Sequence, residues 1–355
     1  MSEFLDGVGV IFSLEMRQRL RGVAWYVLLG VFFGILLLIT VVTSIVVFSA
    51  HATNPSQTVG GPLYSLVIYF VLLLGVLVAP AMSGNAINGD RDAGTLATTQ
   101  VTLITTWQLI VGKFLAAWVT ALGFLAVSVP FLLYCAVVGG TKPLTITVSL
   151  LVLIVELGVV AAIGVGLSGL ITRPLFSVVV TYLAIAALTL GTLIAFVLGG
   201  LAVQTKTVMY SWDNIHVKSQ TCTGVHKYSE SVPRFDLDWG VLAPNPFIVI
   251  TDAVPTTYDA NGQPNDLFGQ FKTVERGAQL SPLRDSSPAA ACREELGYAS
   301  NSYTGQSPAA VISATAPSWA IGFALQLVLA VAALLGAWAK TRTPARRLSK
   351  GSRIA

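Results

Sequence analysis

The sequence predicts an all-helical protein that crosses a membrane six times, and three observations support this fold class. Of the 355 residues, 54% are hydrophobic and only 11% are charged, whereas a soluble domain carries about a quarter charged residues. The apolar residues gather in runs of about 20 or more, the length that an α-helix needs to span a bilayer. The basic residues gather between those runs, as they do in polytopic membrane proteins.

Six segments are long and apolar enough to span the bilayer. They are predicted at residues 23–48, 63–83, 114–138, 144–171, 175–203 and 318–339. Pro80 and Pro130 fall inside two of these segments and should kink or end their helices locally. The first 22 residues mix acidic and basic side chains before an apolar run too long for a signal-peptide core, so no cleavable leader is expected.

The placement of Lys and Arg predicts that both termini are cytoplasmic. In this orientation the short outer loops contain only Lys142. The inner side receives the other basic residues near the spans, namely Arg17, Arg19, Arg21, Arg91, Lys113, Arg173, Lys340, Arg342, Arg346, Arg347, Lys350 and Arg353. The predicted order is therefore a cytoplasmic interfacial helix at 1–22, five spans within 23–203, an extracytoplasmic domain at 204–317, a sixth span at 318–339 and a basic cytoplasmic tail at 340–355.

Residues 4–22 have an imperfect amphipathic pattern. A helix lying in the inner interface would bury the apolar face and leave Arg17, Arg19 and Arg21 at the lipid headgroups. Such a helix can act as a gating elbow beside the first span or simply as a topology anchor, and the pattern fits both.

The long segment 204–317 is rich in Pro, Ser, Gly and aromatic residues, which indicates a small packed domain rather than a linker. It contains Cys222 and Cys292, and an oxidising compartment would favour a disulfide between them over two buried thiols. The bridge would close a loop of about 70 residues, worth roughly 4 kcal/mol in the chain-entropy model. Cys135 lies in an apolar run, and the three histidines are scattered, so no metal site is expected.

The stretch 237–254 is apolar but too short and too interrupted by proline to span. It contains Trp239, Pro244, Pro246 and Phe247. It fits a re-entrant or interfacial segment in the outer leaflet, or the core of the outer domain.

Glu156 lies near the middle of the fourth predicted span. A carboxylate facing lipid there would cost at least a few kcal/mol, so it should face the bundle interior or a dimer interface. It would either contact a transported substrate or act as a hinge of the path, or it would form an interhelical hydrogen bond to a Ser or Thr.

The second and third spans are joined by the strongly polar segment 83–100. Asp90 or Asp92 can cap a short helix there. Arg91 can pair with a carboxylate of a partner protein, although a solvated loop would have the same composition.

The run Gly89-Asp90-Arg91-Asp92-Ala93-Gly94-Thr95-Leu96, followed by Trp107-Gln108-Leu109-Ile110-Val111-Gly112-Lys113, resembles the signature of type-2 ATP-binding-cassette (ABC) exporter permeases of bacteria. That family has six helices with both termini inside, and an enlarged loop before the last helix in some members. Pro244-Asn245-Pro246-Phe247 also resembles an Asn-Pro-Phe motif before the last helix of related permeases. The resemblance covers most of the chain.

The resemblance implies that residues 90–100 form the coupling helix that docks on the ATPase, with Asp90, Arg91, Asp92, Gly94, Thr95 and Leu96 at its start. The Thr-Pro often found after this segment is replaced by Val101-Thr102-Leu103, so the end of the helix is not defined. No phosphate-binding loop is present, because Gly112-Lys113 is preceded by Trp107 where that motif requires glycine. ATP and Mg²⁺ would therefore bind to a separate ATPase.

The leading interpretation is a non-enzymatic permease subunit in the bacterial cell (inner) membrane. It would pair with a second copy or a homologue and with two cytoplasmic ABC ATPases, and export an amphipathic or hydrophobic substrate; no nucleic acid is expected as a partner. The alternatives are an ABC-type mechanical transmitter acting on an extracytoplasmic process, or a membrane enzyme with its site in the outer domain. The short 49–62 loop argues against the transmitter. For the enzyme, His216 and His226 with Asp213 and Glu230 are available, but no motif frames them.

Overall fold

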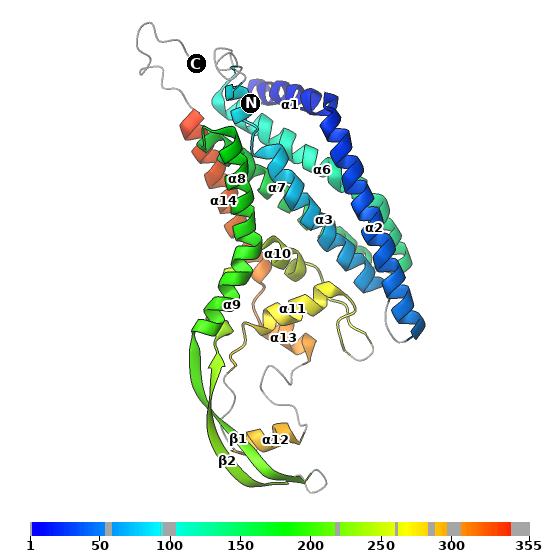
Figure 1. The fold of residues 1–355 in the computed structure, drawn as a ribbon, viewed down its shortest axis with the longest axis vertical. Coiled ribbons are helices and arrows are strands. Elements are labelled where there is room, and N and C mark those ends of the chain that lie inside the picture. The colour runs from blue at the N-terminus through cyan, green and yellow to red at the C-terminus, as the bar shows by residue number, and fades with distance from the viewer. Residues whose placement is uncertain are drawn as a thin grey trace. The chain divides into compact units, whose positions relative to one another are not determined.

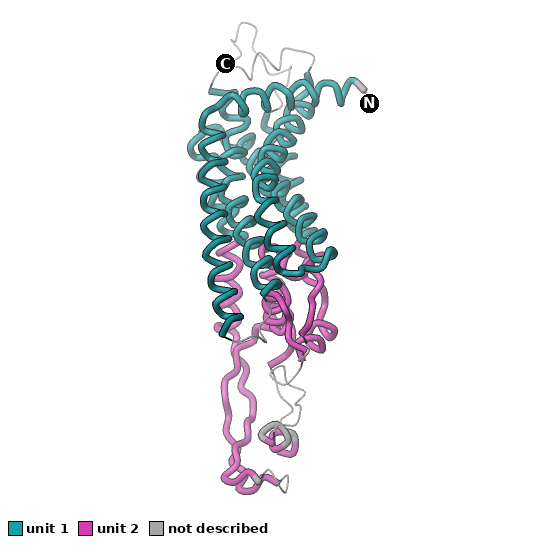
Figure 2. Tube along the Cα trace, turned by 90° about the vertical axis from the view of Figure 1, so that its right-hand side faces the viewer, with its two compact units in different colours: residues 1–188, 323–355 teal, residues 189–322 magenta. Residues whose placement is uncertain are grey.

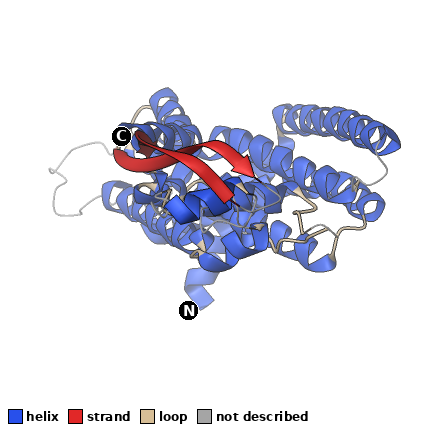
Figure 3. Cartoon of the chain, turned by 90° about the horizontal axis from the view of Figure 1, so that it is seen from below, coloured by secondary structure: helices blue, strands red, loops and turns tan. Residues whose placement is uncertain are grey.

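The computed structural model describes residues 2–53, 59–92, 94, 104–216, 221–259, 262–282, 288–296 and 307–341. Within these ranges the protein is helical apart from one β-hairpin (Figures 1 and 3). It forms two compact units, coloured separately in Figure 2. Unit 1 comprises residues 1–188 and 323–355, and unit 2 comprises residues 189–322.

Among the described residues, six helices are long and apolar enough to cross a membrane, which confirms a polytopic helical membrane protein. Their boundaries lie within a few residues of the predicted ones, except that the third span begins at Thr106 instead of 114. The added turns include Gln108 and Lys113, and protein covers both side chains. The helices of unit 1 are α1 (Ser2–Arg21), α2 (Val23–Thr53), α3 (Gly60–Ser83), α4 (Asn88–Asp92), α6 (Thr106–Gly139), α7 (Pro143–Leu170), α8 (Pro174–Ala186) and all but the first turn of α14 (Ser318–Thr341).

Local sequence explains where these helices begin and end. Thr105 and Gln108 form a reciprocal capping box at the start of α6, and Gly140 ends it with φ 58°. Pro143 and Pro174 occupy the first positions of α7 and α8, where proline costs no hydrogen bond. Pro130 lies within α6 and does not end it, contrary to one of the two predicted outcomes, because the helix continues to Gly139.

The centre of unit 1 is formed by α3, α6 and α7, which pack on one another, while α1 packs along α6. Over its most apolar stretch, 56% of α7 is buried, compared with 17% for the fifth span, Pro174–Ala202. The fifth span is therefore a peripheral helix whose apolar surface must be covered by lipid or another subunit.

Small residues allow α7 and α14 to approach closely. A methyl group on Gly166 would overlap with Ala333, and one on Gly169 would overlap with Ala337. Such contacts between small residues are a usual way for membrane helices to associate, since burial of apolar surface does not drive association in lipid.

Unit 2 begins in the second half of the fifth span. The span contains a π-helical turn, η1 (Ala187–Gly191), and continues as α9 (Thr192–Ala202). The elements that follow are β1 (Gln204–His216), β2 (Thr221–Pro233), the short 3₁₀ helices η2 (Phe235–Leu237) and η3 (Trp239–Leu242), α10 (Pro246–Ala253), α11 (Leu267–Gly277), α12 (Pro288–Glu295) and α13 (Pro308–Ala314).

The β-hairpin was not predicted within the expected packed domain over 204–317. β1 and β2 pair antiparallel from Gln204 opposite Pro233 to His216 opposite Thr221. Most hairpin residues are exposed, but Tyr210 and Trp212 are half-buried on this ribbon. The packed part of unit 2 is formed by η3, α10, α11 and α13, with Leu242, Ala243, Val249, Ile250, Val254, Phe268 and Val311 buried.

Candidate functional site

A cluster of buried charges joins α1, α4 and α6, three helices that lie far apart in the sequence. Lys113 of α6 is only 1% exposed, and its Nζ lies 2.6 Å from Asp90 Oδ2 of α4. The same ammonium forms an ion pair with Glu15 of α1. One buried cation therefore holds two carboxylates from different helices.

The fit of α1 against α6 positions Glu15. Val8, Ile11 and Glu15 recur at helical spacing and form the buried face of α1. Ile11 and the backbone of Val8 lie so close to Gly112 that a side chain at this position would overlap with them. Gly112 thus allows α1 to approach closely, and the next residue, Lys113, meets Glu15.

Arg19 also belongs to this cluster, which corrects the prediction that all three arginines of α1 lie at the headgroups. Its guanidinium lies 3.7 Å from Glu15 Oε2, and it donates to Thr120 Oγ1 at 3.4 Å. Glu15 and Arg19 are one helical turn apart, so both face α6. Burial lowers the pKa of Arg19, and the neighbouring Glu15 carboxylate partly opposes this shift.

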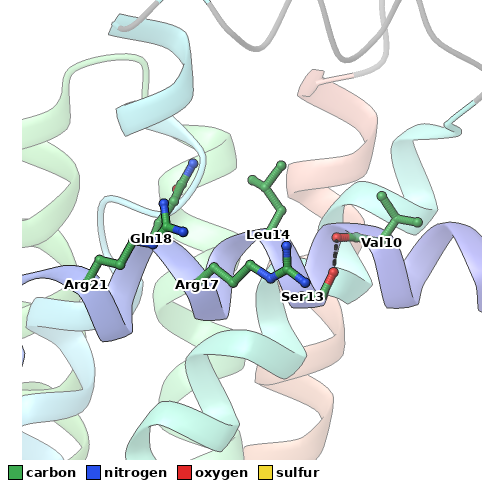
Figure 4. A pocket seen from close by; sticks show the side chains of 6 residues that line it. All are labelled: Val10, Ser13, Leu14, Arg17, Gln18 and Arg21. Carbon is green, nitrogen blue, oxygen red and sulfur yellow. Dashed lines mark hydrogen bonds between the residues drawn. The ribbon is translucent and has the colours of Figure 1, made fainter.

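Arg17 and Arg21 lie on the other, exposed side of α1. They line a shallow hollow of about 340 Å³ with Val10, Ser13, Leu14 and Gln18 (Figure 4). These six residues share one face of the helix, and Ser13 donates to the Val10 carbonyl at 2.9 Å. The arginines of α1 therefore lie on two faces of the helix. Arg19 faces α6, and Arg17 and Arg21 lie on the exposed face.

Helix α4 contains the start of the predicted coupling segment, and it is fixed to α7 by its side chains. Asn88 is fully buried and donates to the Ile171 carbonyl at 2.6 Å. The backbone N–H groups of Ile87 and Asn88 donate to Ser168 Oγ at 3.0 and 3.2 Å. Arg91 donates to Asn88 Oδ1 at 2.7 Å.

These contacts change the predicted roles of the motif residues. Asp90 lies within α4, which begins at Asn88, and its carboxylate pairs with Lys113. Arg91 is directed at its own helix and at the Ile171 carbonyl, leaving Asp92 and Gly94 as the exposed members of the motif. Gly94 has φ 68°, a left-handed conformation that favours glycine. Thr95, Leu96 and most of 90–100 lie outside the described residues.

The four ionic groups balance, with Glu15 and Asp90 against Lys113 and Arg19. This balance matters because removing charges from water costs several kcal/mol per ion, which is offset only when partners are close and well oriented. From the sequence, Lys113 was expected only as a basic residue on the cytoplasmic side and as part of a motif, and no role was predicted for Glu15. The helical spacing of Glu15 with Val8 and Ile11 was the only sequence signal that pointed to its burial.

Glu156 is completely buried in α7. The amide of Gln326 on α14 faces its carboxyl group, whereas a Ser or Thr was one of the predicted partners. Both residues belong to unit 1, so this polar pair lies inside the bundle between two predicted spans.

The predicted disulfide between Cys222 and Cys292 is confirmed, with the two Cα atoms 5.9 Å apart. It connects β2 to α12. Cys135 is buried in α6 as a free thiol, as expected for a small apolar residue.

The candidate re-entrant segment is folded into unit 2. Trp239 lies in η3, Pro244 follows it, and Pro246 and Phe247 begin α10, whose Val249 and Ile250 are fully buried. Asn245 caps α10 by accepting from the Phe247 N–H at 2.9 Å. Its amide donates to the Thr189 carbonyl in the π-turn at 2.7 Å and to Thr192 Oγ1 at 2.9 Å. This asparagine therefore ties α10 to the fifth span.

In the described part of the chain, no group of three His, Cys, Asp or Glu side chains could hold a metal ion. His226 pairs with Asp213 at 3.0 Å, but both side chains are more than half exposed on the hairpin. No model of a known protein family matches the chain, and no curated protein matches it either.

Proposed function

We propose that this chain is the permease subunit of an ABC exporter of the type-2 kind, driven by ATP hydrolysis on separate ATPase subunits. The observation that carries the proposal is the contact of Lys113 with Asp90 and Glu15. It brings together the two parts of the motif, Gly89–Leu96 and Gly112-Lys113, which are separate in the sequence. It also ties both parts to the N-terminal helix.

The contact suits the task that such a subunit performs. An ATPase can move the spans only if the segment on which it docks is fixed to them, because a flexible connection would not favour one state of the bundle over another. Asp90 and Asn88 fix α4 to α6 and to the end of α7, respectively. The exposed Asp92 then becomes the first residue of this segment available to a basic side chain of the ATPase.

The remaining parts of the proposal follow from this assignment. The N-terminus, the C-terminus and α4 lie in the cytoplasm of a bacterium, and the part of unit 2 between α9 and α14 lies outside the cell membrane, where Cys222 and Cys292 can oxidise. Two permease chains, or this chain and a homologue, pair with two ATPases that bind ATP and Mg²⁺. The apolar lining of the helices suits an amphipathic or hydrophobic cargo.

Co-purification with the ATPase encoded next to this chain tests the proposal. Asp92→Ala should weaken binding of the ATPase at unchanged thermal stability, because Asp92 is exposed. Arg91→Ala should weaken both, because Arg91 is bonded to Asn88 within α4. Lys142→Met, at an exposed lysine of a different loop, is the matched control. Full assembly and full ATPase stimulation in both the Asp92 and Arg91 variants would contradict docking at this segment.

A further inference from the structure

Unit 2 contains a second buried ionic cluster, built between α10, α11 and the start of α14. Five ionisable side chains in it are at most 6% exposed, namely Asp252, Asp266, Lys272, Glu275 and Arg276. The cluster is separate from the motif discussed above and lies within unit 2.

Asp252 holds the first turn of the last span. Its carboxylate accepts from Arg276 through Nε at 2.6 Å and Nη2 at 3.0 Å. It also accepts from the Ser318 hydroxyl at 3.1 Å and from the Trp319 N–H at 3.0 Å. A negative charge is favourable at this position because the first N–H groups of a helix have no partner within the helix.

Arg276 strengthens the same attachment from the other side. Its Nη1 donates to the Thr315 carbonyl at 2.8 Å, just before α14 begins. We call Asp252, Arg276 and the segment 315–319 the α14 clamp. The Asp252–Arg276 pair is bidentate and buried. The clamp therefore depends on Arg276 keeping both of its hydrogen bonds to the Asp252 carboxylate.

Glu275 is the carboxyl group that this arrangement leaves poorly satisfied. Among the described residues, no donor forms a hydrogen bond of good geometry with either of its buried oxygens. Arg276 Nε lies 3.7 Å away, and Ser318, Gln279 and Asp252 also face the carboxyl group. Burial, together with the charge of Asp252, raises the pKa of Glu275 to about 7.

The second cation, Lys272, forms no direct ion pair with Glu275 among the described residues. Lys272 donates to the Val254 carbonyl at 2.6 Å, and burial lowers its pKa. Asp266 accepts from the Gly269 N–H at 2.7 Å as the cap of α11, and burial raises its pKa. With three carboxyl groups against two cations, the cluster carries one negative charge in excess when every group is ionised.

We propose that Glu275 is a proton-binding site and that its ionisation loosens the α14 clamp. When Glu275 is neutral, Asp252 is the only carboxylate that pairs with Arg276 in this cluster. When Glu275 releases its proton to water, a second carboxylate competes for Arg276 and repels Asp252. The inference concerns unit 2 alone and does not depend on the proposed exporter function; if that function holds, the pH that is sensed is the pH outside the cell membrane.

Hydrogen–deuterium exchange of the full chain in lipid nanodiscs tests this inference. The amides of 315–323 should exchange about tenfold faster at about pH 8.5 than at about pH 5.5, after correction for the intrinsic pH dependence of exchange. Glu275→Gln should abolish this difference and keep the segment protected at both pH values. Glu230→Gln, on the exposed hairpin, should leave the difference unchanged.

Asp252→Asn tests the clamp itself, and it should raise exchange of 315–323 at both pH values. If this variant exchanges like the wild type, Asp252 does not hold the start of α14. A wild-type protein with no pH-dependent change in this segment, or a Glu275→Gln protein that keeps the full change, would overturn the role of Glu275. The wild-type profile decides the question even if Glu275→Gln does not fold.

Discussion

The two buried ionic clusters are built from the same kinds of side chains but differ in charge balance. Around Lys113 two carboxylates face two cations. The two Lys113 pairs join α6 to α1 and to α4, and the Arg19–Glu15 pair lies within α1. Around Arg276 three carboxyl groups face two cations. The first cluster is therefore suited to be a permanent connection between helices, whereas the second contains one carboxyl group that can gain or lose a proton at little cost.

Removing the central cation should break the first cluster and produce the largest effect. Lys113→Met leaves the buried Glu15 and the partly exposed Asp90 without their common partner, and a loss of about 3–5 kcal/mol in the free energy of unfolding is expected. Thermal unfolding in detergent, followed by tryptophan fluorescence, measures it. Lys142→Met should change stability by less than about 0.5 kcal/mol. Equal unfolding temperatures for the two variants would show that the Lys113 ion pairs do not stabilise the fold.

Unit 2 also has a covalent connection that unit 1 lacks. Replacing both Cys222 and Cys292 by Ser should destabilise the hairpin and α12 by roughly 4 kcal/mol, because the disulfide closes a long loop. Limited proteolysis should then cut within 204–296 faster, while cleavage of unit 1 stays unchanged. Cys135→Ala, which keeps the disulfide, is the control, and equal cleavage rates in all three proteins would contradict the prediction.

The charge excess in unit 2 predicts a pH dependence of stability. The pKa of Glu275 in the folded protein is about 7, above its usual value of 4.5. Between these values the folded state binds more protons than the unfolded state, so the free energy of unfolding falls as pH rises through this window. The loss has an upper limit of about 3 kcal/mol and does not grow further above pH 7.

Denaturant unfolding at several pH values, monitored by protease sensitivity of unit 2, measures this loss. Glu275→Gln should be more stable than the wild type at about pH 8 and equally stable near pH 4.5. A wild-type protein that gains stability over this range would show that the sign is wrong.

The smallest expected effect concerns the connection of α10 to the fifth span. Asn245→Ala removes the cap of α10 and two bonds to the fifth span, so a loss of about 1–2 kcal/mol is expected. Asn245→Asp keeps the acceptor for the Phe247 N–H but cannot donate to Thr189, and it should lie between Ala and wild type. Thermal unfolding of the three proteins gives this order, and a stable Asn245→Ala protein would remove Asn245 as a structural connection.

The six spans could be predicted because a long apolar segment has few other stable environments. The ionic clusters could not, because they depend on contacts between distant residues: Glu15 and Lys113 are 98 positions apart, and Asp252 and Trp319 are 67 apart. The hairpin was missed although Tyr210 and Trp212 alternate with Ser211 and Asp213, a pattern typical of a strand. The aromatic residues were interpreted as evidence for a packed domain, and this alternation was overlooked.

The contact of Gly166 and Gly169 with Ala333 and Ala337 has a consequence for molecules that diffuse within the bilayer. Two helices whose backbones nearly touch leave no room between them for an acyl chain. A lipid-like molecule diffusing in the membrane could therefore not pass between α7 and α14 at these positions. Such a molecule could reach the interior only between another pair of helices. A larger side chain at any of these four positions would open a gap here only by pushing α7 and α14 apart.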